Sequence, residues 1–192
     1  MPDTSTSGQI GKEIGREIGP GISPQIGPAR AEDAPALAAL SIEVWLGTYI
    51  REGVAPVFAD YALRHFTAEA VAGWIAAPEG VFLVARDAAG PVGYLRLEEA
   101  RPAPVAAPGV SPAEIVTLYV RPRFHGVGLG RALLAAGLEA AQARGLPRPW
   151  LAVNSENTGA LAFYAACGFV SIGQTVFRIG EGAYPNELLA AP

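Results

Sequence analysis

The chain has 192 residues, of which 51% are hydrophobic, and this is enough to build one packed core but not obviously two. Its 14 basic and 18 acidic residues give a formal net charge of −4 at pH 7. Because proteins neutralise phosphates with clustered Lys and Arg, this balance argues against a nucleic-acid partner or an anionic membrane surface.

The first 24 residues differ in composition from the rest of the chain. Glycine recurs in them too often for a stable helix, and no alternation of polar and apolar residues indicates a strand. We predict a flexible tail over residues 1–24 and one domain over residues 25–192. The alternative is a helix that packs on a partner, since Ile10, Ile14 and Ile18 recur at helical spacing.

From Gln25 onward the chain alternates between predicted strands and helices. Capping residues and apolar spacing predict helices over 34–46, 57–66, 67–75, 128–144 and 157–166. A short strand begins at Gln25, and further strands are predicted over 81–85, 92–97, 114–120, 150–153 and 168–179, the last range holding one strand or two. A proline-rich loop over 101–112 precedes the strand that ends at residue 120. This order predicts a mixed α/β fold.

The segment that follows the strand over 114–120 carries the strongest functional signal. A Pro-containing turn leads to three glycines in alternate positions, Gly126, Gly128 and Gly130, and then to a helix. This arrangement leaves unpaired backbone N–H groups at the positive end of the helix dipole, which is where a pyrophosphate binds. The glycines alone are a weak motif, so the prediction depends on the strand before them and the helix after them.

Two ordered motifs carry a resemblance to a known family. The first is His125–Gly130, and the second is Asn157, Ala160, Phe163-Tyr164 and Gly168-Phe169. They resemble the acetyl-CoA pyrophosphate loop and the N-x-x-A-x-x-F-Y-x-x-x-G-F segment of the GNAT superfamily of N-acetyltransferases, with His125 where that family prefers Gln or Arg. The resemblance covers about residues 25–181. It implies a GNAT fold, which is a mixed, mostly antiparallel sheet with splayed central parallel strands and flanking helices.

The resemblance also implies acetyl-CoA as cosubstrate. In GNAT enzymes the thioester lies between the splayed strands, where an unpaired backbone N–H stabilises the charge that builds on the carbonyl oxygen. By this resemblance Tyr164 protonates the departing thiolate, although it could instead be a core aromatic. Asn157 contacts the pantetheine arm and can also cap its helix. The other residues implied are Leu118, Tyr119 and Val120 for the arm and acetyl group, and Gly126, Val127, Gly128, Leu129, Gly130 and Arg131 for the pyrophosphate.

A base must also accept the proton of the attacking amine. Glu114 is the best placed carboxylate, because it enters the cosubstrate strand at the side of the cleft, and it could act directly or through water. Glu98 and Glu99 on the preceding strand are reserve candidates. Each could instead be an ordinary solvated charge. Ala152 stands where the ribosomal-protein N-terminal acetylases of the superfamily carry glutamate, which argues against that activity.

The acceptor is suggested by a further resemblance to the bacterial spermidine/spermine N-acetyltransferase branch. It depends on Trp45-x-x-Thr48-Tyr49, on residues 93–97 and on Phe177-x-x-Gly180, with Thr175 where that branch has His. Trp45 and Tyr49 lie one helical turn apart and could wall an amine pocket, or they could be core aromatics. Glu98 could attract a polycation.

We therefore predict an enzyme that moves the acetyl group of acetyl-CoA to a primary amine by direct attack in a ternary complex. The amine is a polyamine if the branch resemblance holds. The alternatives are acetylation of an amino acid or an amine xenobiotic, and a catalytically weak acyl-CoA-binding sensor.

The remaining expectations concern metals, location and assembly. The single Cys167 excludes an internal disulfide, and no cluster of metal ligands is evident, so we expect no metal. No run approaches the roughly 18 consecutive apolar residues that a membrane span needs, and no apolar signal core follows Met1, so we expect a cytoplasmic protein without a membrane partner. Because members of the superfamily are often dimers, a homodimer is an expectation of the resemblance.

Overall fold

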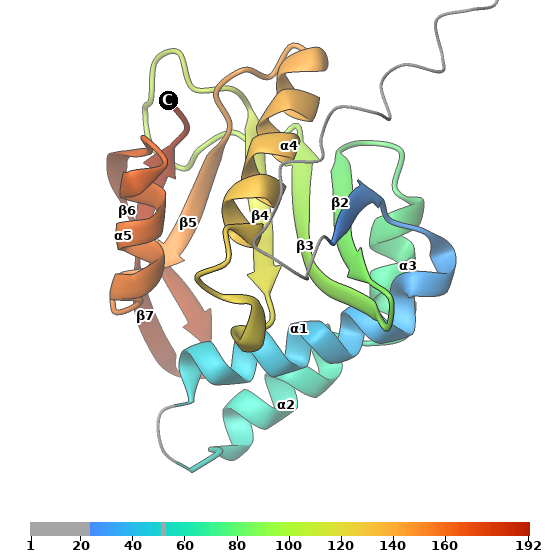
Figure 1. Ribbon diagram of the computed structural model, residues 1–192. Helices are drawn as coiled ribbons and strands as arrows, with labels where there is room; N and C mark the ends of the chain where they lie inside the picture. The colour runs from blue at the N-terminus through green and yellow to red at the C-terminus, as the bar shows by residue number, and fades with distance from the viewer. Residues whose placement is uncertain (1–23, 51–52) are drawn as a thin grey trace, which may run out of the picture.

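The computed structural model describes residues 24–50 and 53–192 of the chain, so the tail predicted for residues 1–24 lies outside the described residues except for Pro24. The described residues form one sheet in the order β1-β2-β3-β4-β5-β7-β6 (Figure 1). Its strands are β1 (Gln25–Pro28), β2 (Val81–Asp87), β3 (Gly90–Glu99), β4 (Ala113–Val120), β5 (Trp150–Asn154), β6 (Val170–Ile179) and β7 (Gly182–Ala190). The helices are α1 (Ala34–Tyr49), α2 (Pro56–His65), α3 (Ala68–Ala76), α4 (Leu129–Ala143) and α5 (Thr158–Ala166), with short 3-10 turns η1 (Ala31–Asp33) and η2 (Pro122–Phe124).

All the predicted elements form, with bounds shifted by a few residues, and local chemistry explains where they begin and end. Thr67 caps α3 as expected, because its hydroxyl accepts a hydrogen bond from the Ala70 N–H at 3.1 Å. A proline lies in the first turn of α1, where no backbone donor is needed. Gly145 follows α4 with a φ of 77°, a left-handed conformation that suits glycine and ends the helix.

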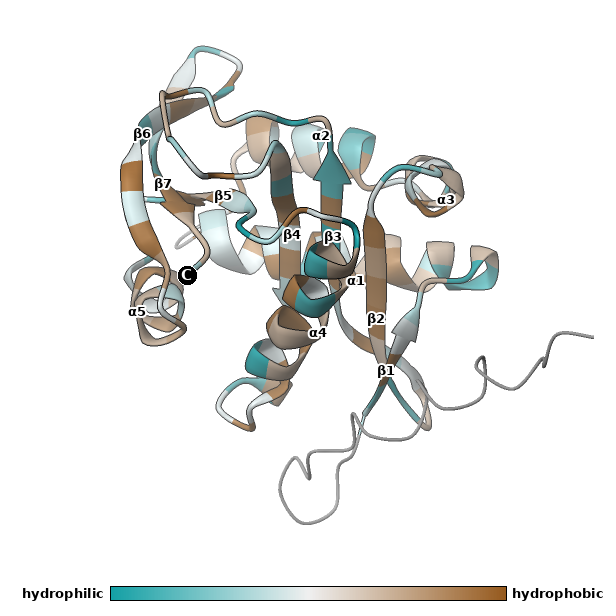
Figure 2. Cartoon of the chain, turned by 90° about the horizontal axis from the view of Figure 1, so that it is seen from above, coloured by the Kyte–Doolittle hydropathy of each residue, from teal (hydrophilic) through white to brown (hydrophobic). Residues whose placement is uncertain are grey.

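Helices cover both faces of the sheet. In the view from above, α4 and α5 lie on one side, and α2 and α3 lie on the other (Figure 2). Under α4 the sheet buries an aliphatic core that includes Leu95 and Leu133. On the opposite face Leu37 of α1 packs near Tyr94 of β3, whose hydroxyl is 2.7 Å from the Ser41 hydroxyl. None of the helices in residues 24–50 and 53–192 is both long enough and apolar enough to cross a membrane.

The two central strands diverge almost as soon as they meet. β4 and β5 run parallel and share one register pair, Glu114 with Trp150. On its other edge β5 pairs with β7 along its whole length, from Trp150–Ala190 to Asn154–Asn186, whereas no further residue of β5 pairs with β4. The carboxyl-terminal halves of β4 and β5 therefore have no strand between them, which confirms the predicted splay.

The prediction for the end of the chain was incomplete, because a second closing strand, β7, lies at residues 182–190. β7 does not simply extend the sheet but inserts between β5 and β6. Pro185 argues against an inner strand at this position, because proline has no N–H to donate to a neighbouring strand. The structure accommodates Pro185 because it lies one residue beyond Asn186–Asn154, the last register pair with β5, and its carbonyl still accepts from the Ser155 N–H at 2.9 Å.

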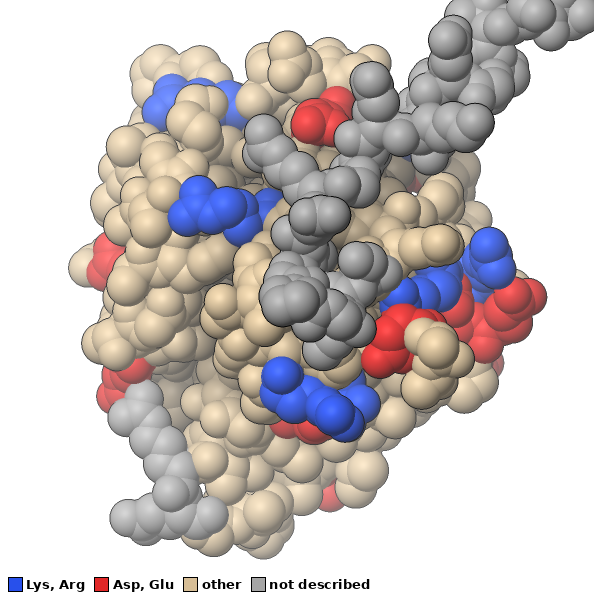
Figure 3. All heavy atoms as spheres, in the orientation of Figure 1, with Lys and Arg blue, Asp and Glu red and all other residues tan. Residues whose placement is uncertain are grey.

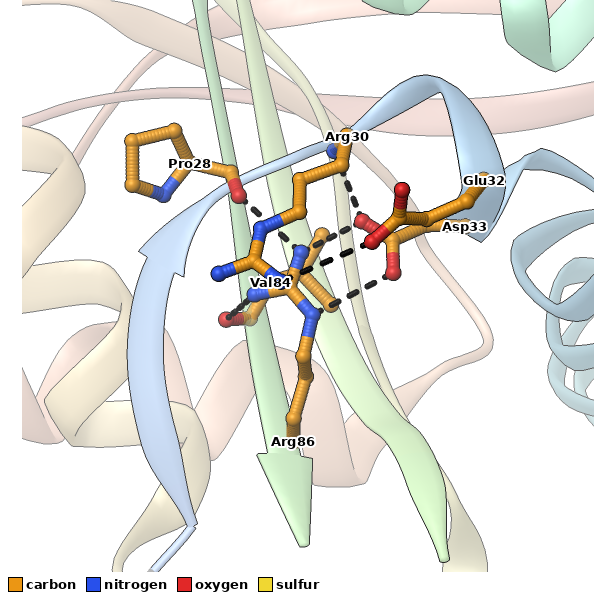
Figure 4. Close-up of polar contacts among 6 residues, drawn as sticks. All are labelled: Pro28, Arg30, Glu32, Asp33, Val84 and Arg86. Carbon is orange, nitrogen blue, oxygen red and sulfur yellow. Dashed lines mark hydrogen bonds and ion pairs between the residues drawn. The ribbon is translucent and has the colours of Figure 1, made fainter.

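A buried ion pair joins the start of α1 to β2 (Figure 4). The Arg86 guanidinium contacts both carboxylate oxygens of Asp33, at 3.2 Å from Nε to Oδ1 and more closely from Nη2 to Oδ2, and donates to the Pro28 carbonyl at 3.0 Å. The Arg30 N–H donates to Asp33 Oδ2 at 2.7 Å. Burial alone would raise the pKa of Asp33, but the bonds from Arg86 and Arg30 and their charges outweigh it and hold that pKa below its usual value.

Glycine is required where β3 passes closest to β4. A Cβ on Gly93 would lie 2.9 Å from the Tyr119 carbonyl oxygen and 3.2 Å from Cδ1 of Leu133. The backbone oxygen cannot move away without disturbing the strand pair, so this close approach excludes any side chain. Gly93 is in register with Val120 at this point of the β3–β4 pair.

Candidate active site

A cleft of about 680 Å³ occupies the space where β4 and β5 diverge. The residues that line it come from α1, β4, the loop before α4, the first turn of α4, β5 and α5. Those predicted to bind the cosubstrate and found in its wall are Leu118, Tyr119, Val120, Gly126, Gly128, Leu129, Gly130, Arg131 and Asn157. Val127, which was predicted with them, is not in the wall, and 39% of its surface is exposed.

The glycine loop forms one end of this cleft. Gly126 and Gly128 have φ values of 77° and 86°, which are strained for other residues, so the turn requires them. The first backbone bond of α4 runs from the Ala132 N–H to the Gly128 carbonyl at 3.0 Å. The N–H groups that precede it lie at the positive end of the helix and have no partner within α4, as an anion site needs.

His125 holds this loop against the end of β4. Its Nε2 lies 2.8 Å from the Val120 carbonyl oxygen, so Nε2 carries the proton and donates. Phe124, 4% exposed, anchors the preceding turn in the aliphatic core. The residue that departs from the family preference therefore stabilises the turn through its side chain.

The start and the body of α5 bring residues of the second motif, including Asn157 and Tyr164, to the other wall of the cleft. Asn157 caps α5, accepting from the Ala160 N–H at 3.1 Å, and it also lines the cleft. Its cap role is confirmed, and the cap leaves its amide NH₂ group able to donate to a bound molecule. Tyr164 lines the cleft with 8% of its surface exposed, and its ring packs 5.3 Å from that of Phe169. Burial, and then Cys167 nearby, raises the pKa of Tyr164, so the phenol keeps its proton at neutral pH.

These features occur together in one known class of enzyme. Residues 45–169 match the model of the Acetyltransferase (GNAT) family. The chain belongs to the acetyltransferase (GNAT) family. This GNAT domain has a mixed sheet in which most strands run antiparallel and one pair runs parallel, as the family fold requires.

Individual relatives match this GNAT domain over different lengths. An uncharacterized N-acetyltransferase of Mycobacterium tuberculosis is 42% identical over 67 residues, which span 35% of the chain and 43% of that protein's length. An uncharacterized N-acetyltransferase of Lactobacillus delbrueckii is 27% identical over 160 residues, which cover 82% of the chain and 91% of that protein. The crystal structure of PaiA N-acetyltransferase from Thermoplasma acidophilum, a complex with coenzyme A, superposes with a TM-score of 0.65 at 20% identity, covering 86% of the chain and 98% of that structure.

The acidic residues predicted for catalysis and polycation binding lie outside the cleft wall and are held by arginines. Glu114 lies where β4 still pairs with β5, in register with Trp150, and its carboxylate is 3.3 Å from Arg101. Arg101 also contacts Glu98 at 2.7 Å, and Arg96 forms a further ion pair with Glu98. Burial raises the pKa of Glu114, and the positive charge of Arg101 only partly opposes the effect.

The two aromatic residues proposed as pocket walls have different places. Tyr49 lines the cleft. Trp45 is 3% exposed and lies behind Tyr49 in the core, with the ring centroids 4.7 Å apart. In the structure Trp45 therefore supports Tyr49 from behind and does not face the cleft.

The prediction missed cleft residues that carry no motif. They are uncharged and include Val44 of α1 and Asn154 at the end of β5. Thr48, which belongs to the Trp45-x-x-Thr48-Tyr49 pattern but was given no role in the site, also lines the cleft. Thr48 follows Val44 by one helical turn, and its hydroxyl donates to the Val44 carbonyl at 2.9 Å. The one available signal was the spacing of Val44, Thr48 and Tyr49 on a single helix face, and that spacing is equally typical of core packing.

Metal ligands do not gather anywhere in residues 24–50 and 53–192, since no group of three or more His, Cys, Asp or Glu side chains is arranged to hold an ion.

On the face shown in Figure 3 most of the surface is uncharged, and its basic side chains stand in separate groups.

Proposed function

We propose that the protein transfers the acetyl group of acetyl-CoA to a primary amine by direct attack in a ternary complex. The observation that carries the proposal is the divergence of β4 from β5 after one register pair, because it opens a cleft with the glycine loop at one end and Tyr164 in its wall. A buried cleft that joins an anion site to a neutral phenol suits a long, phosphate-bearing thioester.

The walls of the cleft suit acetyl-CoA in two respects. The left-handed glycines and the free N–H groups of the first turn of α4 match a pyrophosphate, with Arg131 adding a positive charge. The backbone of Leu118, Tyr119 and Val120 pairs with β3 on one side and has no partner strand on the cleft side. The Val120 carbonyl accepts from His125, and the other polar groups that face the cleft are proposed to bind the pantetheine arm and the acetyl carbonyl. Asn157 is proposed to contact the same arm.

In the proposed reaction the nitrogen lone pair of the neutral amine attacks the acetyl carbonyl, a C–N bond forms and the C–S bond breaks. A backbone N–H of β4 stabilises the negative charge that builds on the carbonyl oxygen. Tyr164 donates its phenolic proton to the departing sulfur. The nitrogen gives up one proton, through water, to Glu114. Glu114 then releases this proton to solvent and Tyr164 regains one from solvent, so the products are the amide and free coenzyme A.

Glu114 is proposed as the base, acting through water because its side chain is not in the cleft wall. Two observations support the proposal. Glu114 lies at the register pair where the strands separate, and its raised pKa brings the carboxylate closer to the operating pH than an exposed glutamate.

The acceptor is proposed to be a small-molecule amine. The polyamine suggested by the sequence would need free carboxylates near the cleft, whereas Glu98 and Glu114 are paired with Arg96 and Arg101. Amino acids, amine xenobiotics and polyamines therefore all belong in an acceptor panel. A cytoplasmic location and a homodimer stay predictions.

The testing experiment follows coenzyme A release from acetyl-CoA over that panel, with wild type and Tyr164→Phe. We expect turnover of at least one amine and a loss of about 10²–10⁴-fold in kcat for Tyr164→Phe, because the variant keeps the ring and lacks only the acid. Acetyl-CoA affinity should be unchanged. Tight acetyl-CoA binding with no turnover of any amine would refute enzymatic transfer and favour an acyl-CoA sensor.

A further inference from the structure

The charges in the cleft wall restrict the class of amine that the cleft can accept more narrowly than membership of the GNAT family does. Among the described residues that line the cleft, Arg131 is the one side chain with a permanent charge, and it lies in the first turn of α4 at the proposed phosphate end. The described part of the wall contains no carboxylate. At the acceptor end, the residues that the structure describes therefore offer no counter-ion for a second ammonium group or for a carboxylate.

The carboxylates of β3 and β4 that were proposed to attract a polycation or act as base are already paired with arginines. Glu98 and Glu114 share the guanidinium of Arg101, and Glu98 also pairs with Arg96, so two carboxylates are balanced by two arginines. Glu99 is bonded to Arg144 at 2.6 Å. A polycation that paired with these carboxylates would compete with the arginines that already balance their charge, so these carboxylates add little attraction for it.

The wall on the α1 side is apolar and aromatic. Val44, Thr48 and Tyr49 face the cleft from successive turns of α1. Tyr49 of α1 and Tyr119 of β4 are the members of an aromatic cluster that line the cleft, and the cluster also contains rings from α2, α3, β6 and β7. The ring centroid of Tyr49 lies 6.4 Å from that of Phe58, 6.3 Å from that of Phe177 and 6.5 Å from that of Tyr184.

These rings hold Tyr49 in one orientation from behind. Burial, and to a smaller extent the neighbouring Tyr61, raises the pKa of the Tyr49 phenol, so the surface it offers is uncharged at neutral pH. A rigid, neutral ring attracts another ring by edge or offset stacking, and it can also attract an ammonium group over its face.

We propose that the acceptor is an aromatic monoamine, an arylalkylamine whose ring packs against Tyr49 and whose single amino group reaches the acetyl group. This inference rests on the proposed function, since it names the class of amine that the same cleft takes. A second positive charge or a carboxylate on the acceptor would enter a cleft whose described wall has no carboxylate and has its one permanent positive charge, Arg131, at the proposed phosphate end.

The test compares kcat/KM for three amines at pH 8: phenethylamine, spermidine as a polycation, and phenylalanine as the same aromatic amine with a carboxylate. We expect phenethylamine to exceed each of the other two by at least about tenfold, which corresponds to about 1.4 kcal/mol of transition-state binding. Equal or better turnover of spermidine or phenylalanine would overturn the inference and leave acetyl transfer intact. Acetyl-CoA binding without turnover of any of these or the other panel amines would instead remove the proposed function.

Variants then test the role of Tyr49. Tyr49→Leu should raise the KM for phenethylamine about tenfold while kcat and the acetyl-CoA affinity change little, and Tyr49→Phe should restore the KM because it keeps the ring. Phe58→Leu removes a ring from the same cluster that does not face the cleft, so it controls for loosened packing. An equal rise in KM for Phe58→Leu and Tyr49→Leu would show a structural effect only and would contradict the contact.

Discussion

Replacement of Arg86 by Met should destabilise the protein by about 3 kcal/mol at pH 7. The variant leaves the Asp33 carboxylate, which is 7% exposed, with the Arg30 N–H as its remaining hydrogen-bond donor from those described above. Loss of one partner of a buried ion pair costs about 3–5 kcal/mol, and we take the lower end because one fifth of the Arg86 side chain is exposed. For a domain of this size the loss corresponds to a decrease of roughly 6–12 °C in Tm.

The sign of the pH dependence follows from the lowered pKa of Asp33. A carboxyl whose pKa is lower in the folded state contributes stability that is present above its unfolded pKa of about 3.9 and is lost as the pH falls below that value. In Arg86→Met the remaining burial raises the pKa, so Asp33 is protonated at a higher pH. The difference in unfolding free energy between wild type and variant should therefore be largest at pH 7 and should shrink toward pH 4.

Urea unfolding at pH 7, 5 and 4 measures this difference. Arg64→Met is the matched control, because its ion pair with Asp60, at 3.1 Å, is solvent-exposed and should contribute less than about 0.5 kcal/mol. A loss below about 1 kcal/mol for Arg86→Met, or a loss that does not vary with pH, would refute the reasoning. The double variant Arg86→Met with Asp33→Asn should recover part of the stability, since it removes the uncompensated charge.

Two further predictions concern the active site. Glu114→Gln should lower kcat/KM and abolish the acidic limb of the pH–rate profile. Burial raises the pKa of Glu114, so the wild-type limb should lie above the usual glutamate pKa of about 4.3. Wild-type activity should increase as the pH rises through this limb. A limb that persists in Glu114→Gln would exclude Glu114 as the base. Gly93→Ala should destabilise the fold by about 1–3 kcal/mol, because its Cβ would lie 2.9 Å from the Tyr119 carbonyl oxygen. Gly27→Ala is the control and should change stability little, because a Cβ there would have no heavy atom within 4 Å. Denaturant unfolding of both variants measures the difference, and equal effects would contradict the close approach at Gly93.

The elements and the cosubstrate loop could be predicted because their signals are local. The alternation of Gly126, Gly128 and Gly130 between a strand and a helix specifies the turn without knowledge of the rest of the fold. The cap at Asn157 is equally local, since it depends on a backbone N–H three residues away.

The rest of the site depends on contacts between distant segments. Trp45 and Tyr49 have the same local context, and only the packing of α2, β6 and β7 decides that one is buried and the other faces the cleft. The positive charge that balances the Glu114 carboxylate comes from Arg101, which lies in the loop between β3 and β4. The path of that loop depends on the whole fold. β7 escaped prediction because Pro185 is compatible with an inner strand only where the neighbouring strand has ended.

The order of the last three strands has a consequence for how the chain is assembled. β1 to β4 form a continuous part of the sheet from residues 25–120, and they can pair while the rest of the chain is still being synthesised. β5 and β6 cannot, because the strand between them is β7, which is made after both. The wall of the cleft that β5 provides is therefore complete only after residues 182–190 have been synthesised and have paired with β5 and β6.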